Sequence, residues 1–480
     1  MKLILKTWFI AFLCASAAYP ASAQNRAVAL KIQQIENNLA SIVRIRGDPN
    51  ATLEQRMKQY KVAGLSIAVI NNGQLAWAKG YGFANADSTR RIDENTLFQA
   101  ASISKPIAAL TALHWVERGK LSLDADINTY LTDWKIPQSR FTEREKITLR
   151  RLLTHTTGLT VHGFRGYAKG KPLPSTRQIV TGQPPANNPA VVADTLPGST
   201  WRYSGGGYLV MQNVLEDVLG KPFGQIAAET VLSKLSMTNS TFEQPLPERL
   251  ESRAATGFFV SGKPIEGQWR TYPEKAAAGL WTTPTDLARY VVEVQQSLRG
   301  KGAGVLSKTM TRQMLTPNKG WGLGPAIQHG GDSLLFSHSG ANVGFRCHLV
   351  AYAYRGQGAV VMTNSDNGDR LIREVLASIA EAYNWADFKP TLVVRGALSP
   401  EQVSAVKGNY QAGKSRINVI EEQGRLLART SFDGTHEFFP VSGQEFILAN
   451  GITLQLRFDT AGKVTQMTDN AGMIFTRKVE

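Results

Sequence analysis

A predicted β-hairpin followed by a long apolar helix is the feature that most constrains the fold of this chain. Residues Gly64–Ile70 and Gln74–Gly82 flank the turn Asn71-Asn72-Gly73, a pattern that predicts two antiparallel strands. Apolar residues then recur at helical spacing from Ile107 to Val116, and Gly119 provides a helix stop. A hairpin joined to a buried helix indicates an α+β fold, in which helices pack against an antiparallel sheet.

The start of the predicted helix carries a serine and a lysine three residues apart. Ser102 and Lys105 share one helix face, so the lysine amine lies within reach of the serine hydroxyl. A serine hydroxyl becomes a strong nucleophile when a base takes its proton, and desolvation lowers the pKa of a lysine enough for that role. A second match to this spacing, Ser404 and Lys407, is interpreted as the surface of a short helix in a different domain. The spacing alone therefore does not identify a site.

The 480-residue chain is long enough for two to three domains. Its changes of composition predict a signal peptide at residues 1–23, a helical lead-in at 24–55, a main domain at 56–388, a linker at 389–400 and a small all-β domain at 401–480. In the last of these, short strands alternate with turn signals, which indicates a small β-barrel or sandwich.

Local patterns give finer predictions. Residues 27–60 are expected to form an amphipathic helical lead-in, and residues 121–160 to be mostly helical. Residues 161–200, rich in Gly, Pro and Asn, are typical of a functional lid or a disordered insert. The pattern from Thr283 to Asp286 predicts a capping box at a helix start. His155 lies at a Thr-rich helix end and is interpreted as structural rather than as a catalytic base.

The first 23 residues are typical of a secretory signal peptide. Lys2 and Lys6 flank the start, the run Trp8–Leu13 is apolar, and Ala21-Ser22-Ala23 supplies small residues for cleavage after Ala23. The apolar run is too short to span a membrane, and no later stretch is long enough. We therefore expect a secreted or periplasmic protein without a transmembrane segment.

Charge and cysteine content narrow the expected partners. The net charge is +16, or +14 without Lys2 and Lys6, and the basic residues are scattered with no nucleic-acid motif among them. This favours loose attraction to anionic envelope polymers over nucleic-acid binding. Cys347 is the only cysteine left after signal cleavage, so no intramolecular disulfide is expected. No zinc-ligand pattern occurs, and no metal or other cofactor is expected.

Three short motifs occur in order along the main domain: Ser102-x-x-Lys105, Tyr203-Ser204-Gly205 and His338-Ser339-Gly340. This order, over roughly residues 50–385, resembles the serine β-lactamase and penicillin-binding-protein superfamily. The most similar branch contains class C β-lactamases, D-alanyl-D-alanine carboxypeptidases and family VIII esterases. The resemblance implies a β-lactamase/transpeptidase-like fold, with an antiparallel sheet flanked by helices, a helical subdomain and here a small C-terminal β-barrel-like domain. Residues 56–388 would then form a serine hydrolase domain.

The resemblance also implies a role for each motif. Ser102 would be the acyl-enzyme nucleophile, and Lys105 and Tyr203 would share the work of general base. Tyr203 needs a pKa below the usual value of about 10 for this task, and Lys105 together with a protonated or hydrogen-bonding His338 would lower it.

The same resemblance places the remaining site residues on and beside the third motif. The backbone N–H groups of Ser102 and Ala341 would form the oxyanion hole, where the loss of one donor typically costs about 2.7–4 kcal/mol of transition-state stabilisation. Gly340 and Asn342 would contact the substrate.

Two positions depart from the pattern of the β-lactamases. Gly205 stands where these enzymes and the carboxypeptidases carry an Asn that helps to hold the lysine and the substrate amide. His338 replaces the lysine of class C β-lactamases, a change seen in esterases and some D-peptidases. Both departures lower the expectation of efficient β-lactam hydrolysis.

The expected function is therefore a secreted or periplasmic serine hydrolase that acts on esters, amides or D-amino-acid peptides. The alternatives are a class C-like β-lactamase or a D-Ala-D-Ala carboxypeptidase and, more remotely, a non-catalytic protein that binds the cell envelope. The intact Ser102, Lys105 and Tyr203 argue against the last of these. The expected partners are small-molecule or peptide substrates, with fragments of peptidoglycan among the candidates.

Overall fold

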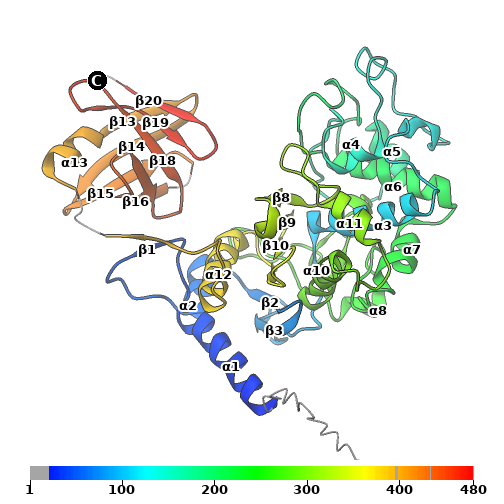
Figure 1. The fold of residues 1–480 in the computed structure, drawn as a ribbon, viewed down its shortest axis with the longest axis horizontal. Coiled ribbons are helices and arrows are strands. Elements are labelled where there is room, and N and C mark those ends of the chain that lie inside the picture. Colours follow the sequence, from blue (N-terminus) through cyan, green and yellow to red (C-terminus); the bar gives the residue numbers. More distant parts are fainter. Residues whose placement is uncertain (1–20, 395–397, 433, 479–480) are drawn as a thin grey trace, which may run out of the picture.

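The computed structural model describes residues 21–394, 398–432 and 434–478 (Figure 1). The predicted signal peptide, apart from its last three residues, lies outside this range. Within the described residues, no helix is both long enough and apolar enough to cross a membrane.

A six-stranded antiparallel sheet forms the centre of the larger part of the molecule. Its spatial order is β3-β2-β11-β10-β9-β8, so the N-terminal hairpin pairs with a strand from near residue 360. The strands are β2 (Gly64–Asn71), β3 (Gln74–Gly82), β8 (Ala326–Gln328), β9 (Leu335–Asn342), β10 (Phe345–Tyr352) and β11 (Gly358–Thr363). The predicted hairpin is confirmed.

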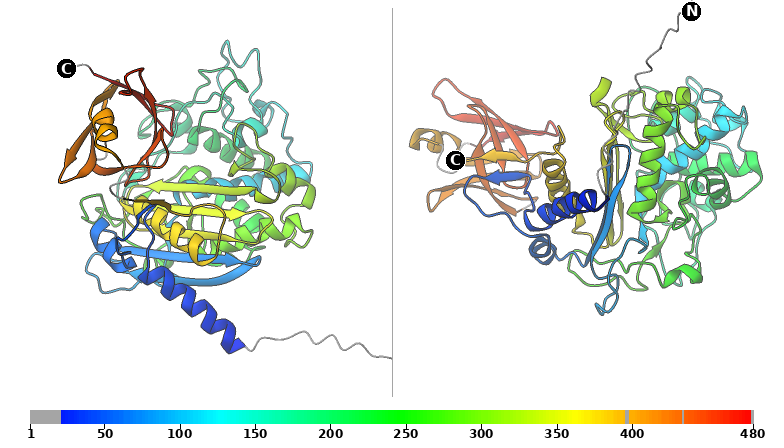
Figure 2. Two further views of the ribbon diagram at one scale, coloured as in Figure 1. Left: turned by 60° about the vertical axis from the view of Figure 1, so that its left-hand side comes forward. Right: turned by 60° about the horizontal axis from the view of Figure 1, so that its bottom comes forward.

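Helices cover both faces of this sheet (Figure 2). Because side chains alternate along a strand, Ile67 and Val69 of β2 pack on one face, and Ala68 and Ile70 pack on the other. The first face is covered by α1 (Ala21–Asn37), α2 (Leu53–Tyr60) and α12 (Gly368–Ala382), and the second by α3 (Ser104–Glu117) and α10 (Pro284–Leu298). The predicted α+β arrangement, an antiparallel sheet flanked by helices, is confirmed.

The segments between the hairpin and β8 form a mainly helical part that packs on α3. Its helices are α4 (Leu149–Leu153), α5 (Thr176–Thr181), α6 (Gly205–Leu219), α7 (Phe223–Ala227), α8 (Glu248–Glu251), α9 (Lys275–Ala278) and α11 (Lys308–Met314). Two short ribbons accompany them, β4 (Phe98–Gln99) with β7 (Trp281–Thr282) and β5 (Tyr167–Ala168) with β6 (Arg270–Thr271).

Two helix predictions were too generous. The expected helix over 27–60 is divided into α1 and α2 by β1 (Val43–Ile45), and Gly47, at φ +91°, helps to turn the chain between them. Within 121–160, only Ile127–Thr129 and α4 are helical. The apolar residues there are buried from turns rather than from one helix face, so their spacing gave a misleading period.

The start of α10 also differs from its prediction. Thr283 caps the helix by accepting the Asp286 N–H at 3.2 Å, with Pro284 in the first turn as expected. The Asp286 carboxylate, however, does not reach back. It accepts hydrogen bonds from the Ser240 hydroxyl and the Asn239 N–H, both at 2.8 Å. This tertiary contact replaces the second half of the capping box.

The C-terminal part is a closed eight-stranded barrel, which confirms the predicted small β domain. Its strands are β13 (Gly408–Ala412), β14 (Ser415–Glu422), β15 (Arg425–Thr430), β16 (Gly434–Pro440), β17 (Glu445–Leu448), β18 (Thr453–Phe458), β19 (Val464–Asp469) and β20 (Ile474–Arg477), preceded by α13 (Pro400–Val406). The segment expected to be a linker contains β12 (Thr391–Val393), which pairs in parallel with β1.

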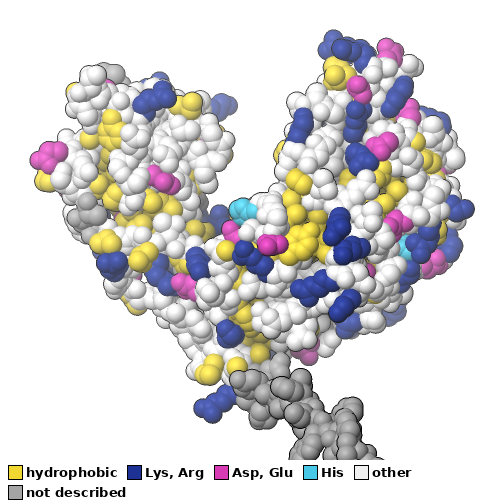
Figure 3. All heavy atoms as spheres, viewed as in Figure 1, with side chains coloured by type: hydrophobic (Ala, Val, Ile, Leu, Met, Phe, Trp, Pro, Cys, Tyr) yellow, Lys and Arg dark blue, Asp and Glu magenta, His cyan; other side chains and the backbone are white. Residues whose placement is uncertain are grey.

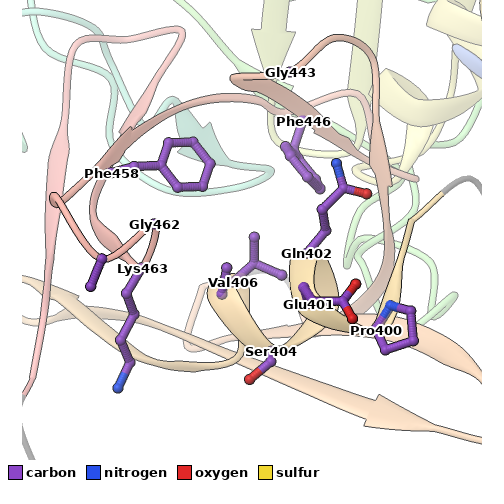
Figure 4. Close-up of a pocket in the computed structure, with 12 residues that line it drawn as sticks. Pro400, Glu401, Gln402, Ser404, Val406, Gly443, Phe446, Phe458, Gly462 and Lys463 are labelled. Carbon is purple, nitrogen blue, oxygen red and sulfur yellow. The ribbon is translucent and has the colours of Figure 1, made fainter.

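The second Ser-x-x-Lys match lies on α13, as its interpretation required. Figure 4 shows Ser404 beside a hollow at the end of the barrel, into which Phe446, Phe458 and Val406 point. The Lys407 ammonium lies 3.3 Å from Glu421 rather than beside the serine. The basic side chains of the molecule are scattered over the visible face (Figure 3), in keeping with the sequence pattern.

Candidate active site

Ser102 lies on a tight turn between β4 and α3. The turn, Ala101–Ile103, is a single 3-10 turn, so the serine precedes the α-helix instead of lying in its first turn. Ala101 has φ +50°, a left-handed conformation that costs a non-glycine residue energy and often marks a functional turn. Gly340 of β9 passes so close that a Cβ there would lie 2.2 Å from the Ala100 carbonyl oxygen. The glycine of the third motif therefore lets β9 lie against the serine turn.

Lys105 is almost completely buried, with 2% of its surface exposed. Its Nζ lies 3.0 Å from the Ser102 Oγ and donates to the Ala277 carbonyl oxygen at 2.7 Å. Neither partner carries a negative charge, and burial lowers the pKa of Lys105 to about 7. A large fraction of the amine is therefore neutral near pH 7, with a lone pair available for the serine proton.

Tyr203 lies on the extended segment that leads into α6. Its ring centroid is 4.2 Å from that of His155, and the Lys105 Nζ lies 4.9 Å from the Tyr203 ring centroid. Burial raises the pKa of Tyr203, and the hydroxyl of Ser102 opposes this only in part. The phenol is therefore protonated near neutral pH, and Lys105 is the stronger candidate for the resting base.

His338 lies on β9 and lines the cavity. Of its two expected states, protonated or hydrogen-bonding, the protonated one is not met. Burial lowers the pKa of His338 to about 3, so the ring is neutral at physiological pH. Its Nδ1 donates to the Ser339 carbonyl oxygen at 2.7 Å, which leaves the buried Nε2 as an acceptor without a hydrogen-bond partner. The expectation that a protonated His338 lowers the Tyr203 pKa is therefore not met, because burial of the ring disfavours an imidazolium.

His155 supports the tyrosine segment. Its Nδ1 accepts the Ser204 N–H at 3.1 Å, and its carbonyl accepts the Arg202 N–H at 2.9 Å. The ring is buried, and burial lowers its pKa well below the usual value. A neutral histidine bonded to the backbone on both sides of Tyr203 agrees with its interpretation as a structural residue.

The residues assigned to substrate contact share one cavity of about 830 Å³. Ser102, Lys105, Tyr203 and His338 line it together with Gly340, Ala341 and Asn342 of β9. The Asn342 amide donates to Gln99 Oε1 at 2.9 Å and to the Ala278 carbonyl at 3.2 Å, so its N–H groups tie β9 to β4 and α9. In the described part of the chain, no three His, Cys, Asp or Glu side chains gather in a way that could hold a metal ion.

A family model described as Beta-lactamase matches residues 50–383. The chain belongs to this family. It is 27% identical over 366 residues to a beta-lactamase of Pseudomonas fluorescens, a match that covers 68% of this chain and 96% of that protein. It is 30% identical over 209 residues to esterase EstB of Burkholderia gladioli, covering 42% and 52% of the two chains. Such relatives, together with the family match, make this beta-lactamase-family protein a serine hydrolase.

The fold is also shared with a solved structure, the octameric penicillin-binding protein homologue from Pyrococcus abyssi. The TM-score is 0.58 at 20% identity, and the match covers 88% of this chain and 98% of the other. At this identity the likeness concerns the fold alone, and together with the family match it confirms the predicted β-lactamase/transpeptidase-like fold.

The departure of this family member at Gly205 has a structural explanation. A Cβ on Gly205 would lie 3.0 Å from the His162 carbonyl oxygen and 3.1 Å from the Phe164 ring. The Gly205 N–H donates to that carbonyl at 3.0 Å. The segment 161–165 therefore occupies the space that a longer side chain at position 205 would need, and it brings His162, Phe164 and Arg165 to the cavity.

Two further cavity residues, Trp201 and Trp321, were not singled out from the sequence. Trp201 is only two residues from Tyr203, a proximity that could have suggested it. Trp321 lies in the turn before β8, more than a hundred residues after Tyr203 in the sequence, and only the tertiary structure brings the two together, at 5.8 Å between ring centroids.

Proposed function

We propose that this serine hydrolase cleaves carboxylic esters through an acyl-enzyme on Ser102. The observation that carries the proposal is the buried Lys105, with its pKa lowered to about 7 and its Nζ 3.0 Å from the Ser102 hydroxyl, in a cavity where the backbone at Gly205 replaces an amide side chain. A neutral amine beside a serine is the base that a hydroxyl nucleophile requires.

In acylation, the Lys105 amine takes the Ser102 proton as Oγ attacks the ester carbonyl carbon. The backbone N–H groups of Ser102 and Ala341 donate hydrogen bonds to the carbonyl oxygen and stabilise the negative charge that develops on it. The bond from carbon to the alcohol oxygen then breaks. The proton held by Lys105 reaches that oxygen through the Tyr203 hydroxyl, which gives one proton and receives another, so the alcohol leaves neutral.

In deacylation, water takes the place of the alcohol. Lys105, again neutral, accepts a proton from the water by way of the Tyr203 hydroxyl, and the resulting hydroxide attacks the acyl carbon. The bond from that carbon to Ser102 Oγ then breaks, and Lys105 returns its proton to the serine oxygen. The carboxylic acid departs.

The charges of the site favour esters over β-lactams. His338 is neutral where class C β-lactamases have a lysine, so it offers no cation to a substrate carboxylate. Gly205 offers no side chain to hold an amide, whereas an ester needs less help because its alcohol leaves more readily than an amine. We expect the same site to cleave amides and D-amino-acid peptides, peptidoglycan fragments included, at lower rates than esters.

We place this reaction outside the cytoplasm. The support is the N-terminal pattern of Lys2 and Lys6, an apolar run and Ala21-Ser22-Ala23, which is typical of a cleaved signal peptide. N-terminal sequencing of the protein from the periplasm of an expressing bacterium should start at Gln24.

The nucleophile is tested with a fluorophosphonate or fluorescent penicillin probe and mass spectrometry. The probe should add its mass to the peptide that contains Ser102, and Ser102→Ala should abolish labelling. Ser404→Ala is the matched control, because it removes the serine of the other Ser-x-x-Lys match and should label like the parent. Equal labelling of the Ser102→Ala variant would show that the nucleophile lies elsewhere.

The substrate class is tested by comparing 4-nitrophenyl acetate and nitrocefin at one pH. The ester should have the larger kcat/KM because of Gly205 and the neutral His338. A larger value for nitrocefin would replace the ester proposal with β-lactam hydrolysis at the same serine.

A further inference from the structure

The cavity has an aromatic wall that the catalytic steps do not use. Trp201 and Trp321 lie with their ring centroids 5.4 Å apart and their planes at 39°, and both line the cavity that holds Ser102. Trp201 is 41% exposed, so part of its ring is open to a ligand.

The structure holds these two rings in place. The indole N–H of Trp321 donates to the Gly324 carbonyl at 3.0 Å, so its hydrogen-bonding need is met within its own turn. Lys319, in that turn, donates to the carbonyl oxygens of Gly198 and Ser199, just before Trp201. The two segments are therefore joined to each other, and the Trp321 ring offers carbon surface rather than a polar group.

The wall lies on the side of the site where an alcohol would leave. The Trp321 ring centroid is 5.8 Å from that of Tyr203 and 5.5 Å from that of His338. In the proposed mechanism the Tyr203 hydroxyl passes a proton to the departing oxygen, so that oxygen lies beside Tyr203. A group attached to it then extends over Trp321 and toward Trp201.

We propose that Trp201 and Trp321 form the binding site for the leaving group and that this site selects esters of uncharged aromatic alcohols. The inference rests on the ester hydrolysis proposed above and names the class of alcohol. A ring placed against the two indoles gains edge-to-face or offset-stacked contact, which is worth about 2- to 10-fold in binding for each ring pair.

The charges around the wall favour a neutral ring. A quaternary ammonium group would also suit an aromatic wall, but Arg165 lines the same cavity and Lys319 lies beside it, and both carry positive charge. An anionic group would be attracted by these cations but would also meet the Asp369 carboxylate, which lines the same cavity and pairs with Arg346 at 3.3 Å.

The test uses two acetate esters that form the same acetyl-enzyme, 2-naphthyl acetate and 2,2,2-trifluoroethyl acetate. Since deacylation is common to both, the ratio of their kcat/KM values reports the leaving group. Trp321→Leu and, separately, Trp201→Leu should lower this ratio about 3- to 10-fold, mainly through a higher KM for the naphthyl ester. Tyr354→Leu is the matched control, because Tyr354 is also 41% exposed but lies outside the cavity, and it should leave the ratio unchanged.

The outcomes separate this inference from the proposed function. An unchanged ratio in both tryptophan variants, with ester hydrolysis intact, overturns the aromatic site and leaves the acyl-enzyme proposal standing. Absence of any ester turnover by a correctly folded parent protein overturns the proposed function instead. A drop in acetylthiocholine turnover that exceeds the drop for the naphthyl ester shows that the wall binds a cation, which also contradicts the proposal. Because Trp201 is exposed, its variant keeps the test valid even if Trp321→Leu fails to fold.

Discussion

At the scale of single residues, the site depends on how burial changes the proton affinity of Lys105. The fold removes this amine from water without giving it a carboxylate partner, so its pKa falls to about 7. Burial lowers the pKa of His338 further, to about 3, so this imidazole is neutral near physiological pH. Of Lys105 and His338, Lys105 is then the one whose charge changes near neutral pH.

The rate of ester cleavage should therefore follow the deprotonation of Lys105. We expect kcat/KM to rise about tenfold per pH unit below pH 7 and to level off above about pH 8, since only the neutral amine accepts the serine proton. A flat profile between pH 5.5 and 8 would remove Lys105 as the base. Stopped-flow or steady-state rates with 4-nitrophenyl acetate, corrected for spontaneous hydrolysis, give this profile.

Tyr203→Phe separates a catalytic tyrosine from one that only packs. If the phenol relays protons between Lys105 and the alcohol, its loss should reduce kcat about 10²–10⁴-fold. The cost in stability should stay near that of one hydrogen bond, about 0.5–1.5 kcal/mol, because the ring and its contact with His155 remain. Melting temperature and kcat should be measured on the same preparation. A normal rate would leave Lys105 to work without Tyr203.

At the scale of elements, the short helix α9 positions Lys105, the base of the proposed mechanism. The Ala277 carbonyl accepts from Lys105 and the Ala278 carbonyl accepts from Asn342, so this one turn ties α3 and β9 to the cavity wall. The residue before α9, Glu274, is fully buried, and neither carboxyl oxygen has a hydrogen-bond partner among the described residues. Burial raises the pKa of Glu274 to about 8.

Glu274→Gln should change how stability depends on pH. The folded protein keeps the Glu274 proton up to about pH 8, whereas the unfolded chain loses it near its usual pKa of about 4.3. Between these values the folded state binds more protons, so this carboxyl makes the free energy of unfolding fall as pH rises. Replacement by Gln removes that part of the decline.

Calorimetric melting at pH 5.5 and pH 8.5 measures the effect. The variant should gain stability relative to the parent at the higher pH. Glu248→Gln, an exposed residue in the first turn of α8, is the control and should melt in parallel with the parent at both pH values. A constant difference between Glu274→Gln and the parent would mean that Glu274 is ionised in the fold.

At the scale of the whole molecule, the barrel is attached through the β1–β12 ribbon (Figure 1). Outward-facing Phe439 and Ile447 of the barrel pack on Val43 and Val393 of the ribbon, whereas the neighbouring Phe438 points into the barrel core. The described residues that line the catalytic cavity all lie between 102 and 369. The barrel is therefore joined to the hydrolase fold without contributing to the cavity wall.

Phe439→Ala and Phe438→Ala form a matched pair that tests this arrangement. Phe439→Ala should weaken the attachment and speed hydrogen exchange in Val43–Ile45 and Thr391–Val393, while the barrel strands stay protected. Phe438→Ala removes a core ring and should destabilise the barrel itself by about 3–5 kcal/mol. Turnover of small esters should stay close to the parent value in both. A large loss of turnover in Phe439→Ala would show that the barrel acts on the site.

The sequence alone was sufficient for the elements whose signals are local. The hairpin at Asn71-Asn72-Gly73, the α3 helix and the alternating strands of the barrel follow from turn chemistry and side-chain periodicity. The order of the three motifs was sufficient for the family. Each of these depends on residues close together in the chain, or on a pattern that relatives share.

Only the tertiary structure decided what surrounds the serine. The pKa of Lys105 depends on burial by α9 and the tyrosine segment, and the neutral state of His338 likewise depends on its burial. The absence of a side chain at position 205 is explained by the 161–165 segment, which packs against Gly205. Trp321 lies near Tyr203 in space although more than a hundred residues separate them in the sequence. Burial and close contacts depend on many residues that are far apart in the sequence, so they cannot be predicted from a local sequence pattern.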